Sequence, residues 1–232
     1  MQAIEIVFLP GLVCDCRIFR SQLATFPNAL GIDGYGDRDS LTDMAQYVLS
    51  RMSSKVIIFG HSMGGRVAME LFRIAPERVA GIALVSTGVH GVSKGEPEKR
   101  AALQAVGREK GFSALIDQWL PPMIGVSNRN NERIVGPLRE MCLSMGQAVF
   151  DAHVTALLQR QSSENLLSKI DCPALVMTGA EDEWSPPDQH HEIATHITNV
   201  KTVIAPGAGH MLMAESPDAV NAALAELIRR VE

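Results

Sequence analysis

The stretch that decides the fold is KVIIFGHSMGG, residues 55–65. Residues 55–59 form a short apolar run ended by a turn residue, which is typical of a strand buried on both faces of a parallel sheet. The pentapeptide GHSMG follows with the spacing G-x-S-x-G, and a helical pattern over residues 63–74 begins directly after the serine. This order of strand, turn and helix predicts a sharp turn that projects the Ser62 hydroxyl from the edge of the sheet.

The residues around Ser62 suit such a turn. Gly60 and Gly64 are expected because a Cβ atom at either position would collide with the neighbouring strand or helix. The turn also directs the backbone N–H of Met63 toward the reaction centre, next to the positive end of the following helix. For His61 a structural role is favoured over a catalytic one. The competing interpretation of the motif is a glycine-rich turn with a passive serine.

Strand and helix patterns alternate through the first and last parts of the chain. The other strand-like runs lie at residues 4–9, 82–85, 174–177 and 200–204, and the other helical patterns at residues 41–52, 187–197 and 217–231. Such alternation implies right-handed βαβ units. We therefore predict an α/β fold with a mostly parallel central sheet and helices on both faces.

Residues 89–171 break this alternation. They contain no strand run rich in β-branched residues, and their four helical patterns are separated by glycine and proline. We expect a core formed by residues 1–88 and 172–232, with residues 89–171 inserted as a helical cap or lid after the third clearly predicted strand. The chain would then be one catalytic domain overall.

Composition excludes several functional classes. The chain has 232 residues, a net charge of −5 and 46% hydrophobic residues, which argues against disorder. It has no run of basic residues, as a nucleic-acid-binding protein needs. Its longest apolar runs reach about half of the roughly 20 residues that span a membrane, and the N-terminal segment lacks the basic region of a signal peptide. We expect a cytoplasmic monomer or homodimer that acts on a small molecule, with neither nucleic acid nor membrane as partner.

The chain has four cysteines, Cys14, Cys16, Cys142 and Cys172. In a cytoplasmic protein they are expected to be free thiols. Cys14 and Cys16 are too close in sequence for C-x-x-C spacing, and no cluster of cysteine and histidine completes a metal site. We therefore expect neither a metal ion nor an organic cofactor.

A nucleophilic serine needs a base, since its hydroxyl is not ionised at neutral pH. His210 follows the last strand-like run and is the best candidate. Asp182 follows the preceding run and is the candidate for the carboxylate that orients the histidine, with Glu181 and Glu183 as alternatives. Because the carboxyl ends of parallel strands meet at one edge of a sheet, Ser62, Asp182 and His210 are expected to converge there.

These residues together resemble the α/β-hydrolase fold superfamily. The chain order Ser62, Asp182, His210 matches the order of nucleophile, acid and base in that family. The segment before Asp182 resembles the family's strand and G-x-x-D-x-x-x-P loop, and Gly209-His210, with Glu215 after it, resembles its G-H-x-x-x-x-E-x-P stretch. We expect Glu215 to cap the last helix or to brace the His210 loop.

One departure from the family concerns the expected oxyanion hole. The family usually has His-Gly after its first long strand, whereas this chain has Pro10-Gly11. By position, the two donors would be the backbone N–H groups of Leu12 and Met63. Pro10 lacks its own N–H but leaves that of Leu12 free, so the hole can still form. The sequence LPGL at this point resembles small esterases.

The substrate pocket is less well defined by the sequence. Trp119, Met123 and Ile124 in the insertion are expected either to line it or to form the core of the cap. With 5% aromatic residues and 11 methionines, the chain favours an aliphatic pocket. His190 and His191 are expected to be solvated on a polar helix face.

The resemblance implies a carboxylesterase-like hydrolase that cleaves a small ester or related acyl compound through a Ser-His-Asp triad and an acyl-enzyme. The same triad serves carbon-carbon bond hydrolases, lactonases and lyases that eliminate small acids, so these remain alternatives. A ligand-binding, receptor-like protein with little turnover is a third hypothesis. An intact triad argues against it, because a binding protein needs no activated nucleophile.

Overall fold

The computed structural model describes residues 4–52 and 54–232. Six strands form one sheet in the order β2-β1-β3-β4-β5-β6, and every neighbouring pair is parallel. The strands are β1 (Ile6–Leu9), β2 (Ala29–Gly31), β3 (Val56–His61), β4 (Val79–Val85), β5 (Ala174–Gly179) and β6 (Val200–Ala205). The predicted α/β class with a parallel central sheet is confirmed.

The central strands are buried and the edge strands are not. Every residue of β1, β3 and β5 is buried, as their continuous apolar sequences predict. The sequence analysis missed β2, a half-buried edge strand of three residues without a β-branched side chain. The third clearly predicted strand is therefore β4, and the insertion follows it as expected.

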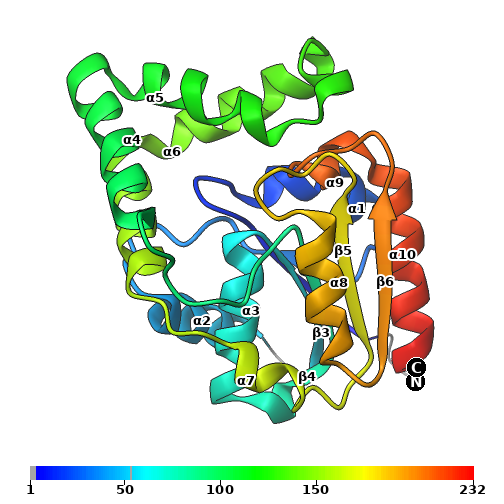
Figure 1. Ribbon diagram of the computed structural model, residues 1–232. Coiled ribbons are helices and arrows are strands. Elements are labelled where there is room, and N and C mark those ends of the chain that lie inside the picture. Colours follow the sequence, from blue (N-terminus) through cyan, green and yellow to red (C-terminus); the bar gives the residue numbers. More distant parts are fainter. Residues whose placement is uncertain (1–3, 53) are drawn as a thin grey trace.

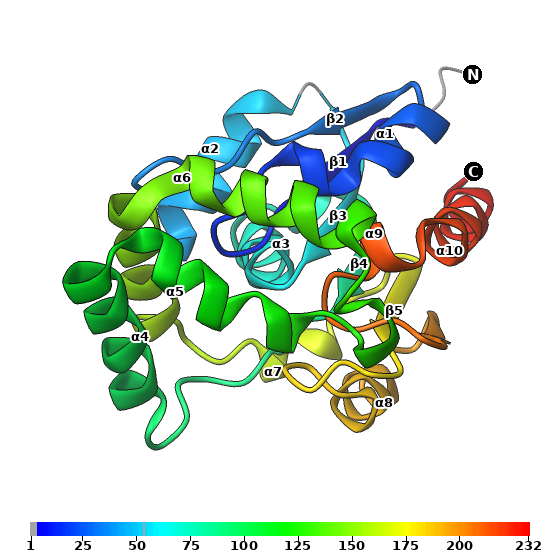
Figure 2. The same cartoon turned by 90° about the horizontal axis from the view of Figure 1, so that it is seen from above.

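Helices cover both faces of the sheet (Figure 2). On one face lie α2 (Leu41–Arg51), α3 (Met63–Ile74) and α8 (Pro187–Thr195), and on the other α1 (Arg20–Thr25) and α10 (Pro217–Val231). Two single-turn helices, α7 (Glu164–Leu167) and α9 (Leu212–Glu215), and four 3-10 turns, Cys16–Phe19, Pro76–Arg78, Pro121–Met123 and Val126–Asn128, complete the connections. The apolar sides of the helices bury the sheet and form a single core with it.

The segment between β4 and β5 contains helices joined by loops, and no strand among its described residues. Its helices α4 (Glu96–Lys110), α5 (Phe112–Trp119) and α6 (Glu132–Leu158) lie above the carboxyl ends of the strands (Figure 1). By length and composition α6 is long and apolar enough to cross a membrane, as the buried core helices of many proteins also are. Gly146, at φ 81° and ψ 167°, divides α6 into two helices that are each shorter than the roughly 20 residues a span requires.

His190 differs from the prediction of a solvated side chain. It is fully buried, because α8 packs against β5 and β6 and turns this position inward together with Ile193. His190 Nε2 accepts a hydrogen bond from the Thr87 N–H at 3.2 Å, and Nδ1–H donates to the Pro186 carbonyl at 3.1 Å. Burial lowers the pKa of His190 to about 4, so it is a neutral structural group that holds the loop after β4.

Candidate active site

The predicted sharp turn joins β3 to α3 and presents Ser62. This residue has φ 55° and ψ −117°, a conformation that is strained for a residue with a side chain. Its N–H donates to the Val85 carbonyl at 2.9 Å, and its carbonyl accepts from the Thr87 hydroxyl at 2.6 Å. A Cβ atom at position 64 would overlap the Leu9 carbonyl, so only glycine fits this crossing of helix and strand. The surrounding backbone thus fixes the strained turn.

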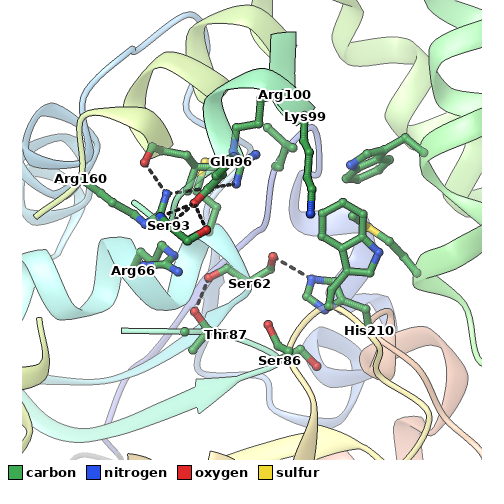
Figure 3. A pocket seen from close by; sticks show the side chains of 18 of the residues that line it. Ser62, Arg66, Ser86, Thr87, Ser93, Glu96, Lys99, Arg100, Arg160 and His210 are labelled. Carbon is green, nitrogen blue, oxygen red and sulfur yellow. Dashed lines mark hydrogen bonds and ion pairs between the residues drawn. The ribbon is translucent and has the colours of Figure 1, made fainter. Parts of the chain in front are cut away.

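A continuous chain of hydrogen bonds leads from Ser62 into the protein. His210 Nε2 lies 2.8 Å from Ser62 Oγ, and its Nδ1 lies 3.0 and 2.9 Å from the two carboxylate oxygens of Asp182 (Figure 3 shows the first of these contacts). With Asp182 ionised, Nδ1 carries the proton and donates it to the carboxylate. Nε2 is then left as the acceptor for the Ser62 hydroxyl. The structure therefore brings together all three residues that the sequence analysis grouped.

The Asp182 carboxylate is buried and accepts several hydrogen bonds. Oδ1 accepts from the N–H groups of Trp184 and Ser185 at 2.9 and 2.8 Å, and Oδ2 accepts from the Thr178 hydroxyl at 2.9 Å. Burial raises the pKa of Asp182, but the nearby His210 and these donors outweigh burial and hold the pKa well below its usual value. Asp182 is therefore ionised at neutral pH and fixed in orientation.

The two alternative acids do not reach the histidine. Glu183 is exposed and pairs with Arg129 at 3.5 Å. A carboxylate oxygen of Glu181 instead lies close to Gly125: a Cβ atom added to this glycine would be 2.9 Å from that oxygen. Among the described carboxylates, only Asp182 bonds to His210.

His61 supports the position of His210 from the residue before the serine. Its Nε2 lies 3.0 Å from the His210 carbonyl. Burial, reinforced by the nearby His210, lowers the pKa of His61 to about 3. The ring is thus neutral at pH 7, and Nε2–H donates to that carbonyl. His61 therefore anchors the backbone of the His210 loop and does not contact the Ser62 hydroxyl.

The two predicted oxyanion donors lie beside Ser62. Leu12 and Met63 both line the cavity above the serine. Within the described residues, neither backbone N–H donates to another protein group. Both N–H groups are thus free to donate to a group bound in the cavity, which the predicted oxyanion hole requires.

His153, which the sequence analysis missed, holds the loop that carries Leu12. This fully buried histidine of α6 accepts a hydrogen bond from the Val13 N–H through Nδ1 at 3.4 Å, and its Nε2–H donates to the Gly36 carbonyl at 3.0 Å. Burial lowers the pKa of His153 to about 4, which keeps the ring neutral and able to accept. Val13 has φ 47°, so this contact stabilises an unfavourable backbone conformation next to Leu12.

Glu215 joins the cap to the loop of His210, one of the two roles expected for it. Its Oε2 accepts from the Gly125 N–H at 2.8 Å and from Asn128 Nδ2 at 3.0 Å, and its Oε1 accepts from the Gly209 N–H at 3.1 Å. The N–H of His210 itself donates to a carbonyl of the cap at 2.8 Å. The cap is therefore part of the scaffold that positions the histidine.

Replacing Glu215 by alanine should loosen this junction. Three donors would lose their acceptor, so we expect a loss of about 1–3 kcal/mol in the free energy of unfolding. We also expect slower labelling of Ser62 by a fluorophosphonate probe. Glu192→Ala, at an exposed position on α8, should change the unfolding free energy by less than about 0.5 kcal/mol. Wild-type stability and labelling of Glu215→Ala would show that Glu215 does not brace the loop.

A cavity of about 450 Å³ opens over Ser62, between the sheet and the cap. Trp119 and Met123 line this cavity, which was one of the two alternatives expected for them. Ile124 does not: the 3-10 turn at Pro121–Met123 redirects the chain, and the Ile124 side chain is buried in the core. The prediction that Ile124 lines the pocket is therefore wrong.

The cavity is also not aliphatic. Both tryptophans of the chain contribute to its wall, together with one phenylalanine. Basic and acidic side chains form much of the remaining surface, and Figure 3 shows several of them grouped around Ser62: Arg66, Glu96, Lys99, Arg100 and Arg160. The expectation of an aliphatic pocket is thus corrected, since composition counts residues over the whole chain and does not say where they gather.

The structure contains one candidate cation site within the described residues. Ligand atoms of Asp15, Cys16 and Asp33 lie within 4.8 Å of one another. Both carboxylate oxygens of Asp15 are already bonded to Arg17, at 2.6 to 3.0 Å. That guanidinium charge opposes a metal ion, and none of these residues lines the cavity. All four cysteines are free thiols, as expected.

Known proteins resemble the chain over most of its length. The 2-succinyl-6-hydroxy-2,4-cyclohexadiene-1-carboxylate synthase of Enterobacter sp. (strain 638) is 25% identical, over 97% of this chain and 91% of that protein. The pimeloyl-(acyl-carrier protein) methyl ester esterase of Nitrosomonas europaea is 24% identical, over 78% of this chain and 74% of that protein. The structure of a thermophilic esterase from Thermogutta terrifontis, solved with malate bound, matches with a TM-score of 0.90 and 26% identity, covering 98% of this chain and 90% of that one.

A family model gives the assignment. The model described as "Alpha/beta hydrolase family" matches residues 6–223, which include the whole sheet, the cap and the three residues of the hydrogen-bonded chain. The sheet order, the turn at Ser62 and the position of the cap agree with this match. The chain therefore belongs to the alpha/beta hydrolase family.

Proposed function

We propose that this protein is a serine hydrolase that cleaves a small ester or related acyl compound through an acyl-enzyme. The observation that carries the proposal is the unbroken hydrogen-bond chain from Ser62 Oγ through His210 to the buried Asp182, at the floor of a cavity. Two of the similar proteins are named esterases, which supports ester cleavage.

The proposed reaction uses each group in turn. Ser62 Oγ attacks the substrate carbonyl while His210 Nε2 takes its proton, and the N–H groups of Leu12 and Met63 stabilise the resulting oxyanion. His210 then gives the proton to the leaving alcohol, which departs and leaves Ser62 acylated. Water, deprotonated by His210, attacks the acyl group and releases the acid. Asp182 holds the imidazole in the tautomer that accepts at Nε2 and stabilises the imidazolium.

A panel of 4-nitrophenyl esters tests this reaction class. A cavity of about 450 Å³ should accept acetyl and butyryl groups, whereas a palmitoyl chain should exceed it, so we expect kcat/KM to fall steeply along the series. A fluorophosphonate probe, which labels activated serines, should modify the intact protein. Absence of both labelling and ester hydrolysis would contradict the proposal.

A second candidate is carbon-carbon bond cleavage, lactone opening or the elimination of a small acid by the same three residues. The observation in its favour is that one relative, similar over 97% of this chain, is named a synthase and not an esterase. Comparing 4-nitrophenyl butyrate with a vinylogous diketone separates the two classes. Faster turnover of the diketone would favour the second candidate, and a stable bound product after one turnover would favour a receptor-like role.

A further inference from the structure

The cavity over Ser62 carries an excess of positive charge. Four basic and two acidic side chains line it: Arg66, Lys99, Arg100, Arg160, Glu96 and Glu183. Glu183 is directed outward to its ion pair with Arg129. A hydrolase for a neutral ester has no need of these cations, because charge is costly to hold in a partly desolvated cavity.

Two of the four cations are already neutralised in part. Glu96 forms ion pairs with Arg100 at 2.7 Å and with Arg160 at 2.6 Å. Burial opposes ionisation of Glu96, but hydrogen bonds from Arg160 and Arg100 lower its pKa to about 2, so it is charged. Arg160 also donates to three backbone carbonyls, and its side chain is 1% exposed. This group of three residues forms the wall and keeps one net positive charge.

Arg66 has no such partner. Within the described residues it forms no ion pair, and its hydrogen bonds go to one residue: Nη1 donates to the His90 carbonyl at 2.8 Å and Nη2 to His90 Nε2 at 3.5 Å. Burial, together with the nearby charge of Arg160, lowers the pKa of Arg66 to about 9. The Glu96 carboxylate acts in the opposite direction, but it forms no ion pair with Arg66. Arg66 is therefore still charged at neutral pH, without a directly paired anion, and keeps further N–H donors available.

The position of Arg66 links this charge to the reaction. Ser62 is the residue before α3, and Arg66 lies in the first turns of that helix, where both residues line the same cavity. Figure 3 shows both side chains directed into one cavity, with Lys99 entering from the cap on the other side of Ser62. An anionic group of a substrate bound at Ser62 would lie between these two cations.

We propose that the substrate carries a carboxylate, which Arg66 binds in the cavity and Lys99 attracts at the rim. This inference rests on the proposed function, because it concerns the substrate cleaved at Ser62. A carboxylate fits the planar, forked guanidinium, which can donate two parallel hydrogen bonds to its two oxygens. The bound anion would also supply the direct ion-pair partner that Arg66 lacks among the described residues.

Matched substrate pairs test the proposal on each side of the scissile bond. One pair is mono-4-nitrophenyl adipate and its methyl-capped diester, which differ by one charge in the acyl group. The other is 4-acetoxybenzoate and its methyl ester, which differ by one charge in the leaving group. We expect the acidic member of at least one pair to have a kcat/KM at least about tenfold higher, mainly through KM, since charge-assisted hydrogen bonds contribute at this level.

Variants of Arg66 and Lys99 then test whether these residues cause the preference for acidic substrates. In Arg66→Gln the ratio of acidic to neutral kcat/KM should fall about 10- to 100-fold, and Arg66→Lys should recover part of it. Lys99→Gln, at an exposed position with little risk to folding, should lower the ratio about threefold or more. Arg139→Gln, which removes a cap arginine outside the cavity, should leave the ratio unchanged. A preference for both neutral members, or an unchanged ratio in Arg66→Gln and Lys99→Gln, would overturn the proposal.

A binding measurement separates this inference from the proposed reaction. Calorimetry with Ser62→Ala should detect adipate, and the double variant with Arg66→Gln should bind it at least about tenfold more weakly; inorganic phosphate should bind more weakly than adipate. Adipate binding without any ester hydrolysis would support the anion site and contradict the proposed function. Hydrolysis of neutral esters, with neither adipate binding nor a preference for acidic substrates, would support the proposed function and contradict the anion site.

Discussion

Replacing Ser62 by alanine should lower kcat/KM for any ester that the protein hydrolyses by roughly four to six orders of magnitude. Among the described residues, the Ser62 hydroxyl is the group to which His210 Nε2 is hydrogen-bonded, at 2.8 Å. Without it no acyl-enzyme can form, and the remaining rate would come from the oxyanion donors and from substrate binding alone. The measurement is steady-state hydrolysis of 4-nitrophenyl butyrate, alongside labelling by a fluorophosphonate probe.

The control for this variant is Ser50→Ala, at an exposed position on α2 far from the cavity. It should hydrolyse the ester and take up the probe like the wild type. Ser62→Ala should also unfold at nearly the wild-type temperature, since the strained turn is held by backbone contacts that alanine keeps. Persistent labelling of Ser62→Ala would mean that a different side chain is the nucleophile.

The turn at Ser62 was predictable because its signals are local. The buried strand, the turn with its two glycines and the helix all lie within residues 55–74, and each of the two glycines is required for a steric reason. Asp182 and His210 were predictable for a related reason: each follows a strand, and parallel strands place their carboxyl ends at one edge. The sequence therefore predicts Ser62 and His210 in the hydrogen-bonded chain and favours Asp182 as its acid, with Glu181 and Glu183 as alternatives.

His153 and β2 were not predictable by the same means. The contact of His153 with Val13 joins residues 140 positions apart, across the interface of cap and core, and no periodicity in α6 marks it. The strand β2 is short and depends on pairing with β1 at the edge of the sheet. Both features result from tertiary packing, which overrides weak local preferences.

The charged lining of the cavity could not be predicted from the sequence for a different reason. Glu96 and Arg100 are four residues apart on α4, a spacing that normally indicates an exposed ion pair on a helix surface. Likewise, Arg66 occupies the polar side of the amphipathic α3. Only the placement of the cap over the sheet turns these polar faces inward, where they form the wall of a cavity.

Replacing Asp182 by asparagine should lower kcat/KM by about four orders of magnitude while leaving the fold intact. The asparagine carbonyl can still accept from the N–H groups of Trp184 and Ser185, which bond to Oδ1 at 2.9 and 2.8 Å. Its amide then takes the place of Oδ2 and donates toward His210 Nδ1. That contact favours the tautomer protonated at Nε2, which cannot take the proton of Ser62.

The tautomer gives this prediction a readout that a merely structural role of Asp182 would not change. In the wild type, nitrogen NMR should find His210 protonated at Nδ1, and in Asp182→Asn at Nε2. Asp188→Asn, an exposed aspartate at the start of α8, should leave both the tautomer and the rate unchanged. A loss of less than about tenfold in Asp182→Asn would show that another group orients the histidine. A large loss with an unchanged tautomer would mean that Asp182 acts mainly through its charge, by stabilising the imidazolium that forms when His210 takes the proton.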